Sequence, residues 1–189
     1  MTFYDKGLLR AMKQAYKGDG YDVALTDDRI TIRTENWGIE ALTGAVPNSV
    51  KSLIVLHNGG LPMQGRAIHV CKSECCSVIA EIVTGDLEEL NSAYTEKGGA
   101  SIKPTRLTMD GCRVWQTGRD LKAVLVDMEN QEILTVDLMD YSLIGNALFR
   151  RSRFGSLFIR TRAVPAEDRL LLEHLSQMQW IPVEEHDEQ

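Results

Sequence analysis

The sequence is poor in cysteine, with four in 189 residues. Small secreted domains that depend on disulfides carry cysteines at a much higher density, so this chain is not a disulfide scaffold. At this length, folding buries roughly 70% of the surface of the unfolded chain, so neither a metal nor a disulfide is needed to hold the core together. We expect thiols in a reducing compartment, and therefore a cytoplasmic protein.

The sequence also lacks a long apolar run. A membrane-spanning helix needs about 20 consecutive apolar residues, and no stretch of this kind is present. The first 17 residues, MTFYDKGLLRAMKQAYK, carry charges and show the spacing of an amphipathic helix, whereas a secretory signal has a continuous apolar core. We therefore expect no membrane partner.

Positive net charge and catalytic motifs are missing as well. The formal net charge of -6 argues against general attraction to nucleic acid or to anionic membranes. The chain has no P-loop, no dinucleotide-binding glycine motif and no zinc-protease helix. Acidic pairs such as Asp137 and Asp140 have no accompanying base or metal ligand in the sequence. These absences favour a protein that is not an enzyme, although they leave the question open.

What is present is a mixture of helical and strand patterns. Helical spacing of apolar residues predicts helices at 3–17, 86–97 and 166–179. Alternation around turn residues predicts strands at 21–26, 29–34, 106–110, 112–117, 121–128 and 132–139, and apolar runs predict further strands at 52–57, 65–72 and 156–164. The apolar run 75–83 fits either a helix or a strand.

Strands joined by short turns, with helices at both ends and one in the middle, indicate an α+β fold with a mainly antiparallel sheet built from hairpins. We expect residues 1–183 to form a single α+β domain and residues 184–189 to form an acidic tail. The alternative is two subdomains divided near 98–100, where Gly98 and Gly99 follow the central helix.

Three of the cysteines lie in one short stretch, HVCKSECCSV (69–78). Zinc takes about four thiolate or imidazole ligands, and the candidates are His69, Cys71, Cys75, Cys76 and Cys112. Their spacing lacks the paired cysteines, two residues apart, of structural zinc sites. Cysteine is also among the most buried residue types. We interpret the cluster as buried packing residues without a cofactor, with a zinc site or a nucleophilic thiol as the alternatives.

The second unusual stretch is rich in arginine: FRRSRFGSLFIRTR (149–162). It carries five positive charges and no acid, so the rest of the chain carries -11. Arginine pairs with phosphate and carboxylate groups in a planar, bidentate manner. We predict a surface for a nucleic-acid backbone or an acidic partner, formed by Arg150, Arg151, Arg153, Arg160 and Arg162. The alternative is that the chain's own acids neutralise these arginines.

A small acidic α+β chain without a catalytic motif is similar in type to the accessory and inhibitor proteins of phages and mobile elements. That similarity implies a regulator or inhibitor that docks on a larger nucleic-acid-processing protein. Trp115 and Trp180, as exposed aromatic residues, would also allow a homodimer. A further alternative is an enzyme for small phosphorylated substrates that uses the glycine-rich loop 58–65 together with the arginines.

Overall fold

The structure is a computed structural model that describes residues 5–73, 77–79, 85–133 and 141–180. The helices are α1 (Asp5–Lys17), η1 (Thr43–Ala45), α2 (Asn48–Asn58), α3 (Gly85–Lys97), α4 (Met128–Gln131), η2 (Ala166–Asp168) and α5 (Arg169–Leu175). The strands are β1 (Tyr21–Leu25), β2 (Arg29–Arg33), β3 (Trp37–Leu42), β4 (Arg66–Val70), β5 (Ser77–Ile79), β6 (Ala100–Met109), β7 (Cys112–Thr117), β8 (Ala123–Asp127), β9 (Tyr141–Ile144), β10 (Ala147–Ser152) and β11 (Gly155–Arg160).

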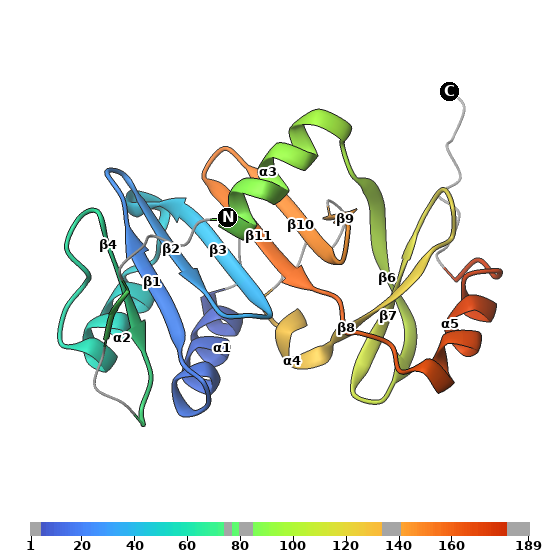
Figure 1. The fold of residues 1–189 in the computed structure, drawn as a ribbon, viewed down its shortest axis with the longest axis horizontal. Helices are drawn as coiled ribbons and strands as arrows, with labels where there is room; N and C mark the ends of the chain where they lie inside the picture. Colours follow the sequence, from blue (N-terminus) through green and yellow to red (C-terminus); the bar gives the residue numbers. More distant parts are fainter. Residues whose placement is uncertain (1–4, 74–76, 80–84, 134–140, 181–189) are drawn as a thin grey trace.

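The strands form one continuous sheet in the order β5-β4-β1-β2-β3-β11-β10-β9-β6-β7-β8. Every neighbouring pair in the sheet is antiparallel. The predicted α+β class with a mainly antiparallel sheet is therefore confirmed. Strand β11 returns from late in the chain to pair with β3, and this pairing joins the N-terminal strands to the rest of the sheet (Figure 1).

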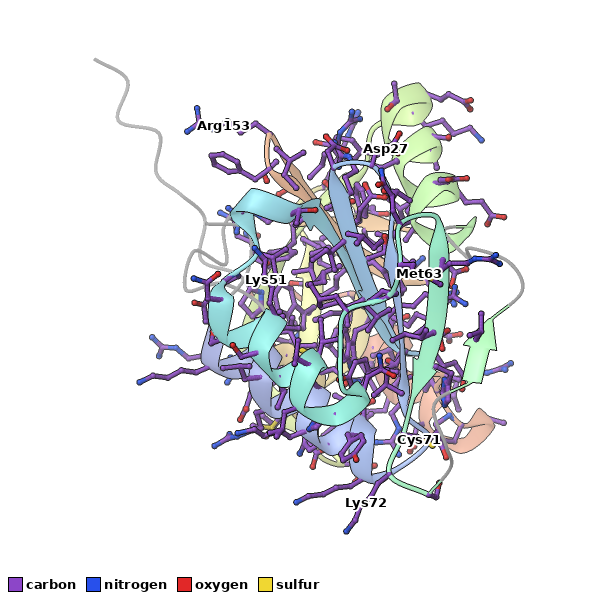
Figure 2. The ribbon with its side chains drawn as sticks, turned by 90° about the vertical axis from the view of Figure 1, so that its left-hand side faces the viewer. Asp27, Lys51, Met63, Cys71, Lys72 and Arg153 are labelled. Carbon is purple, nitrogen blue, oxygen red and sulfur yellow. The ribbon has the colours of Figure 1, made fainter. Side chains whose placement is uncertain are left out.

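Helices cover both faces of the sheet. Successive residues of a strand point to opposite faces, and Leu148 packs into the large core under α1 and α2, whereas Phe149 packs into a smaller cluster under α3. Helix α5 lies on the same side as α3, where its Leu172 packs against β7 and β8. Figure 2 shows the N-terminal strands between α1 and α2 on one side and α3 on the other.

Helix α1 follows the apolar spacing of the sequence. Leu8 and Met12, four residues apart, are completely buried in the large core. Burial of such a side chain contributes about 1.5–3 kcal/mol. Gly7 allows the helix to approach the chain after α4 closely, because a Cβ at this position would lie 1.7 Å from the carbonyl oxygen of Glu132.

Residues 52–57 belong to α2, so the predicted strand at this position is wrong. The helix begins earlier, after Pro47, and buries Val50, Leu53 and Ile54 at helical spacing. It ends at Gly59, whose left-handed conformation (φ 82°) lets its N–H bond to the carbonyl of Val55. A window that starts at Ser52 omits Val50, and without Val50 the apolar run shows no helical period.

Three further expectations differ from the structure. Trp37 begins β3, a strand that the sequence patterns did not predict. Arg150 and Arg151 lie within β10, another strand that the sequence patterns did not predict. The C-terminal helix is shorter than 166–179, because α5 ends at Leu175. The predicted strand 132–139 lies largely outside the described residues.

Candidate functional site

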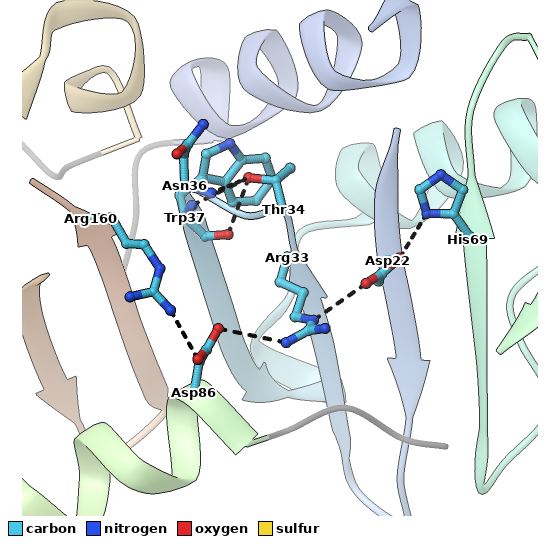
Figure 3. Close-up of polar contacts among 8 residues, drawn as sticks. All are labelled: Asp22, Arg33, Thr34, Asn36, Trp37, His69, Asp86 and Arg160. Carbon is cyan, nitrogen blue, oxygen red and sulfur yellow. Dashed lines mark hydrogen bonds and ion pairs between the residues drawn. The ribbon is translucent and has the colours of Figure 1, made fainter. Parts of the chain in front are cut away.

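A hollow lies where the ends of α1, β2 and β11 meet the start of α3. It has a volume of about 740 Å³. Charged side chains of Asp22, Arg33, His69, Asp86 and Arg160 line it, together with acids at its rim. Figure 3 shows how these side chains approach one another from β1, β2, β4, α3 and β11.

Asp86, in the first turn of α3, bridges two arginines of the sheet. One carboxylate oxygen lies 2.9 Å from Nη2 of Arg160, and the other lies 3.7 Å from Nη1 of Arg33 (Figure 3). Next to Asp86, Leu87 is buried in the small apolar cluster with Phe149 and Phe158. The pair of adjacent residues, one ionic and one apolar, therefore fixes the beginning of α3 on the sheet.

The same network continues to a histidine. Asp22 accepts a hydrogen bond from Nε of Arg33 at 3.4 Å, and its other oxygen lies 2.8 Å from Nδ1 of His69. The hydrogen bond to Asp22 raises the pKa of His69, and a hydrogen bond to the backbone of Asp19 acts in the same direction. Both partners accept hydrogen bonds, so the imidazole is held as a donor and favours its protonated form.

This arrangement resembles a structural charge network more than a reaction centre. Arg160 also donates to the backbone oxygen of Glu35 at 3.1 Å and to Asn146 at 3.3 Å, so its donors are largely occupied. Within the described part of the chain, no hydroxyl or thiol is hydrogen-bonded to His69. An activated nucleophile needs such a contact with its base, so the cleft offers no assembled nucleophile there.

The cysteine cluster is only partly described. His69 and Cys71 meet at Gly20, where a Cβ would lie 2.5 Å from Nε2 of His69 and 2.7 Å from Cβ of Cys71. Cys75 and Cys76 lie outside the described residues. Among the described residues, no group of three or more potential ligands could hold a metal ion. Zinc binding by this cluster thus stays a prediction.

Cys112 does not join the other candidate ligands. It lies on β7, and seven strands separate β7 from β4, which Cys71 follows. Neighbouring strands are about 4.8 Å apart. Cys112 and Cys71 are therefore too far apart to bind the same zinc ion, whose bonds to sulfur are about 2.3 Å long. Cys112 is fully buried, and burial raises the pKa of its thiol, so it is a poor nucleophile.

The five arginines of the 149–162 stretch do not form one surface. Arg160 is bound to Asp86, and Arg162 lies near Asp127, 3.8 Å from its carboxylate. Arg150 stacks over the ring of Tyr141 at 5.6 Å. The alternative in which the chain's own acids neutralise the arginines therefore fits Arg160 and Arg162.

Arg151 and Arg153 are exposed, as Arg162 is, but they differ from it in their contacts. Arg151 donates to the hydroxyl of Thr95 on α3 at 3.0 Å. Arg153, at the turn between β10 and β11, lies over the ring of Phe154 at 4.5 Å and projects outward at the tip of this hairpin (Figure 2). Neither has a carboxylate partner within the described part of the chain, so a role in partner binding stays a prediction for these two.

The sequence-based reasoning missed a denser basic surface on α1. Four exposed cations recur at intervals of four, three and four residues, which places them on one face of the helix. Lys51 on α2 and Lys72, whose N–H bonds to the carbonyl of Tyr16 at the end of α1, extend it. We call this surface the basic helical face: Lys6, Arg10, Lys13, Lys17, Lys51 and Lys72.

The cations of the basic helical face are largely unneutralised. Arg10 binds Glu132 at 2.6 Å. Lys6, Lys13 and Lys17 have no carboxylate partner among the residues that the structure describes. The spacing is visible in the sequence, but a sequence cannot show which cations find acids after folding.

No protein-family model matches the chain, and no curated protein is significantly similar to it. Three solved chains are similar to it, among them two at 12% identity. One is described as a DNA polymerase III beta subunit from Eubacterium rectale; the match covers 88% of this chain and 66% of that one, with a TM-score of 0.37. The other is a DNA polymerase III beta chain from Streptococcus pneumoniae, with 89% and 67% covered and a TM-score of 0.31.

The chain spans about two thirds of the length of these two proteins. At these scores the likeness assigns neither a family nor an activity to it. Within the described ranges, no helix has both the length and the apolar character needed to cross a membrane.

Proposed function

We propose that the protein is a non-enzymatic binding protein whose basic helical face docks on an acidic surface of a larger protein. The observation that carries the proposal is the row of Lys6, Lys13 and Lys17, which have no carboxylate partner in the described part of the chain. Ion pairs within a chain usually consume some of its cations, and a chain with net charge -6 has acids in excess. Cations left over on one helix are available to a partner.

An acidic protein fits this face better than nucleic acid. Attraction to a nucleic-acid backbone is long-ranged and sums over the whole protein, and the net charge of -6 opposes it. A local acidic patch on a protein needs only the few cations that it touches, because salt screens charges beyond about 8–10 Å. The sequence-based expectation that the partner processes nucleic acid, and that docking regulates or inhibits it, is retained as part of the proposal.

A charge-reversal experiment tests the docking face. The variant Lys6→Glu, Lys13→Glu, Lys17→Glu should lose partner capture from an extract of the cells that encode the protein, whereas the unaltered protein should capture the partner at low salt and release it at about 0.5 M salt. Captured proteins are identified by mass spectrometry. A partner without a role in nucleic-acid processing would remove that part of the proposal.

The matched control reverses three exposed cations elsewhere: Lys97→Glu, Arg106→Glu and Lys122→Glu. It changes the net charge by the same amount, so it should capture the partner normally if the face, and not the total charge, matters. A third variant, Arg151→Glu with Arg153→Glu, tests the exposed arginines. If that variant abolishes capture and the lysine variant does not, the basic helical face is the wrong surface and the arginines take its place.

A further inference from the structure

A strip of exposed apolar side chains lies beside the basic helical face. Val55 and Leu56, in the last turn of α2, are 43% and 79% exposed, and Leu61 and Met63, in the following loop, are 39% and 75% exposed. These four are among the ten exposed large apolar residues that the described part of the chain contains, and they fall within nine consecutive positions. Concentrated exposure of this kind marks interaction sites, whereas scattered single residues do not.

The strip adjoins the basic helical face at Val55. Lys51 and Val55 are four residues apart on α2, so their side chains are neighbours on the helix surface. His57, next to Leu56, stacks on Tyr16 of α1 with 3.8 Å between the ring centroids, and burial, followed by the charge of Lys13, lowers the pKa of His57. Figure 2 looks onto this side of the molecule, with Lys51 on α2 and Met63 on the loop before β4.

The loop that carries Leu61 and Met63 is held at both ends. At its start, Asn58 donates to the carbonyl of Gly60 at 2.8 Å. At its end, the N–H of Gly65 bonds to the carbonyl of Leu25 at 2.7 Å, and Gln64 bonds to Asp27 at 2.8 Å. The exposed apolar side chains are therefore presented by an anchored loop, which lowers the entropic cost of binding a partner.

We infer that the apolar strip and the basic helical face together bind an amphipathic segment of the partner, with acidic residues against the lysines and apolar residues against Leu56 and Met63. The inference rests on the proposed function and specifies what that face recognises. Protein interfaces combine an apolar centre with a polar rim, and an amphipathic helix laid in a groove presents both. Flexible leucine and methionine side chains adapt to such a partner.

An anionic membrane is the competing occupant, and the chain's charge disfavours it. Surface-bound membrane proteins combine basic residues with deeply inserted apolar groups, often aromatic ones. The strip contains no aromatic residue, and the net charge of -6 is repelled by an anionic lipid surface. A short acidic segment meets only the local cations, so the same repulsion does not apply.

Two variants separate the inference from the proposed function. Leu56→Ser with Met63→Ser should weaken capture of the partner at least tenfold and leave the salt dependence of the residual binding unchanged. The triple lysine variant should weaken binding and remove its salt dependence. If the lysine variant loses the partner while the serine variant binds normally, the proposed function stands and the inference is overturned. A matched apolar control, Leu170→Ser with Leu171→Ser on α5, should bind normally.

A defined probe tests the recognition directly. We expect an 18-residue synthetic peptide with leucines on one helical face and glutamates on the other to bind, as followed by calorimetry, and a scrambled peptide of the same composition to bind at least tenfold more weakly. Circular dichroism of each variant confirms that the fold is retained. Equal binding of the two peptides overturns the inference. Binding to vesicles of phosphatidylserine and phosphatidylcholine that depends on Leu56 and Met63 would also overturn it, in favour of a membrane surface.

Discussion

The two faces of the sheet hold their helices by different means. Under α1 and α2 the core is large and apolar, and it includes Leu8, Val50 and Ile54. Under α3 the described residues contribute four buried side chains to the apolar cluster, and the ion pairs of Asp86 add to them. On the first face Lys6, Lys13 and Lys17 are exposed to solvent; on the second face Arg33 and Arg160 contact Asp86.

The difference explains why dense positive charge in a sequence is a poor guide to a binding surface. Where apolar packing already holds a helix, its lysines are not needed for folding and stay available. Where a helix docks on a polar part of the sheet, the arginines become part of the attachment, as Arg33 and Arg160 do around Asp86. Arginine suits this internal role because its planar group can bind several acceptors at once.

The largest expected effect is on the free energy of unfolding, and it differs between the large core and the small cluster. Leu8→Ala removes a fully buried side chain from the large core and should lower the free energy of unfolding by about 3–4 kcal/mol. Leu87→Ala should cost less, about 2 kcal/mol, because the small cluster lies at the edge of α3 and can collapse more easily. Urea denaturation of both variants measures the difference. An equal or larger loss for Leu87→Ala would contradict the comparison.

The next largest effect comes from removing the ion pairs that attach α3 to the sheet. Asp86→Ala leaves Arg33 and Arg160 without their shared carboxylate and should lower the free energy of unfolding by about 1–2 kcal/mol, since the groups are only partly buried. Relative to the unaltered protein in the same buffer, the loss should shrink at 1 M salt. The loss caused by Leu87→Ala should not shrink. If both losses respond to salt alike, the attachment of α3 is not ionic.

Local signals made much of the fold predictable. Asp110 and Gly111 adopt φ values of 46° and 76°, which the tight turn between β6 and β7 requires, and this dipeptide is a strong hairpin signal in any sequence. The helix α3 likewise follows its apolar spacing. Strand β3 was missed although it forms a local hairpin with β2; its second pairing, with β11 more than a hundred positions away, has no local signal.

The candidate site was far less predictable, because its contacts depend on strand register. Asp22 meets Arg33 and His69 only because β1 pairs with β2 and with β4 in the observed registers. Trp115, expected to be exposed and available to a homodimer, is fully buried in the large core, since it faces that core from β7. A shift of one residue in the register would turn it outward.

The smallest expected effect is on the pH dependence of stability, to which His69 and His57 contribute with opposite signs. The hydrogen bond to Asp22 raises the pKa of His69 above 6.5, so its contribution to stability is complete below about pH 6.5 and is lost as the pH rises through the raised pKa. Burial lowers the pKa of His57 below 6.5, so its contribution is complete above about pH 6.5 and is lost as the pH falls.

Urea denaturation between about pH 5.5 and 8.5 separates the two histidines. The stability difference between the unaltered protein and His69→Gln should fall with rising pH by less than about 1 kcal/mol, as expected for a partly exposed pair. Asp22→Asn should flatten the same slope, because it removes the acceptor that holds the proton. His57→Gln should instead remove the loss at low pH. A difference for His69→Gln that does not change with pH would mean that Asp22 orients the imidazole without shifting its protonation, and the polar network of the α3 face would then act through geometry alone.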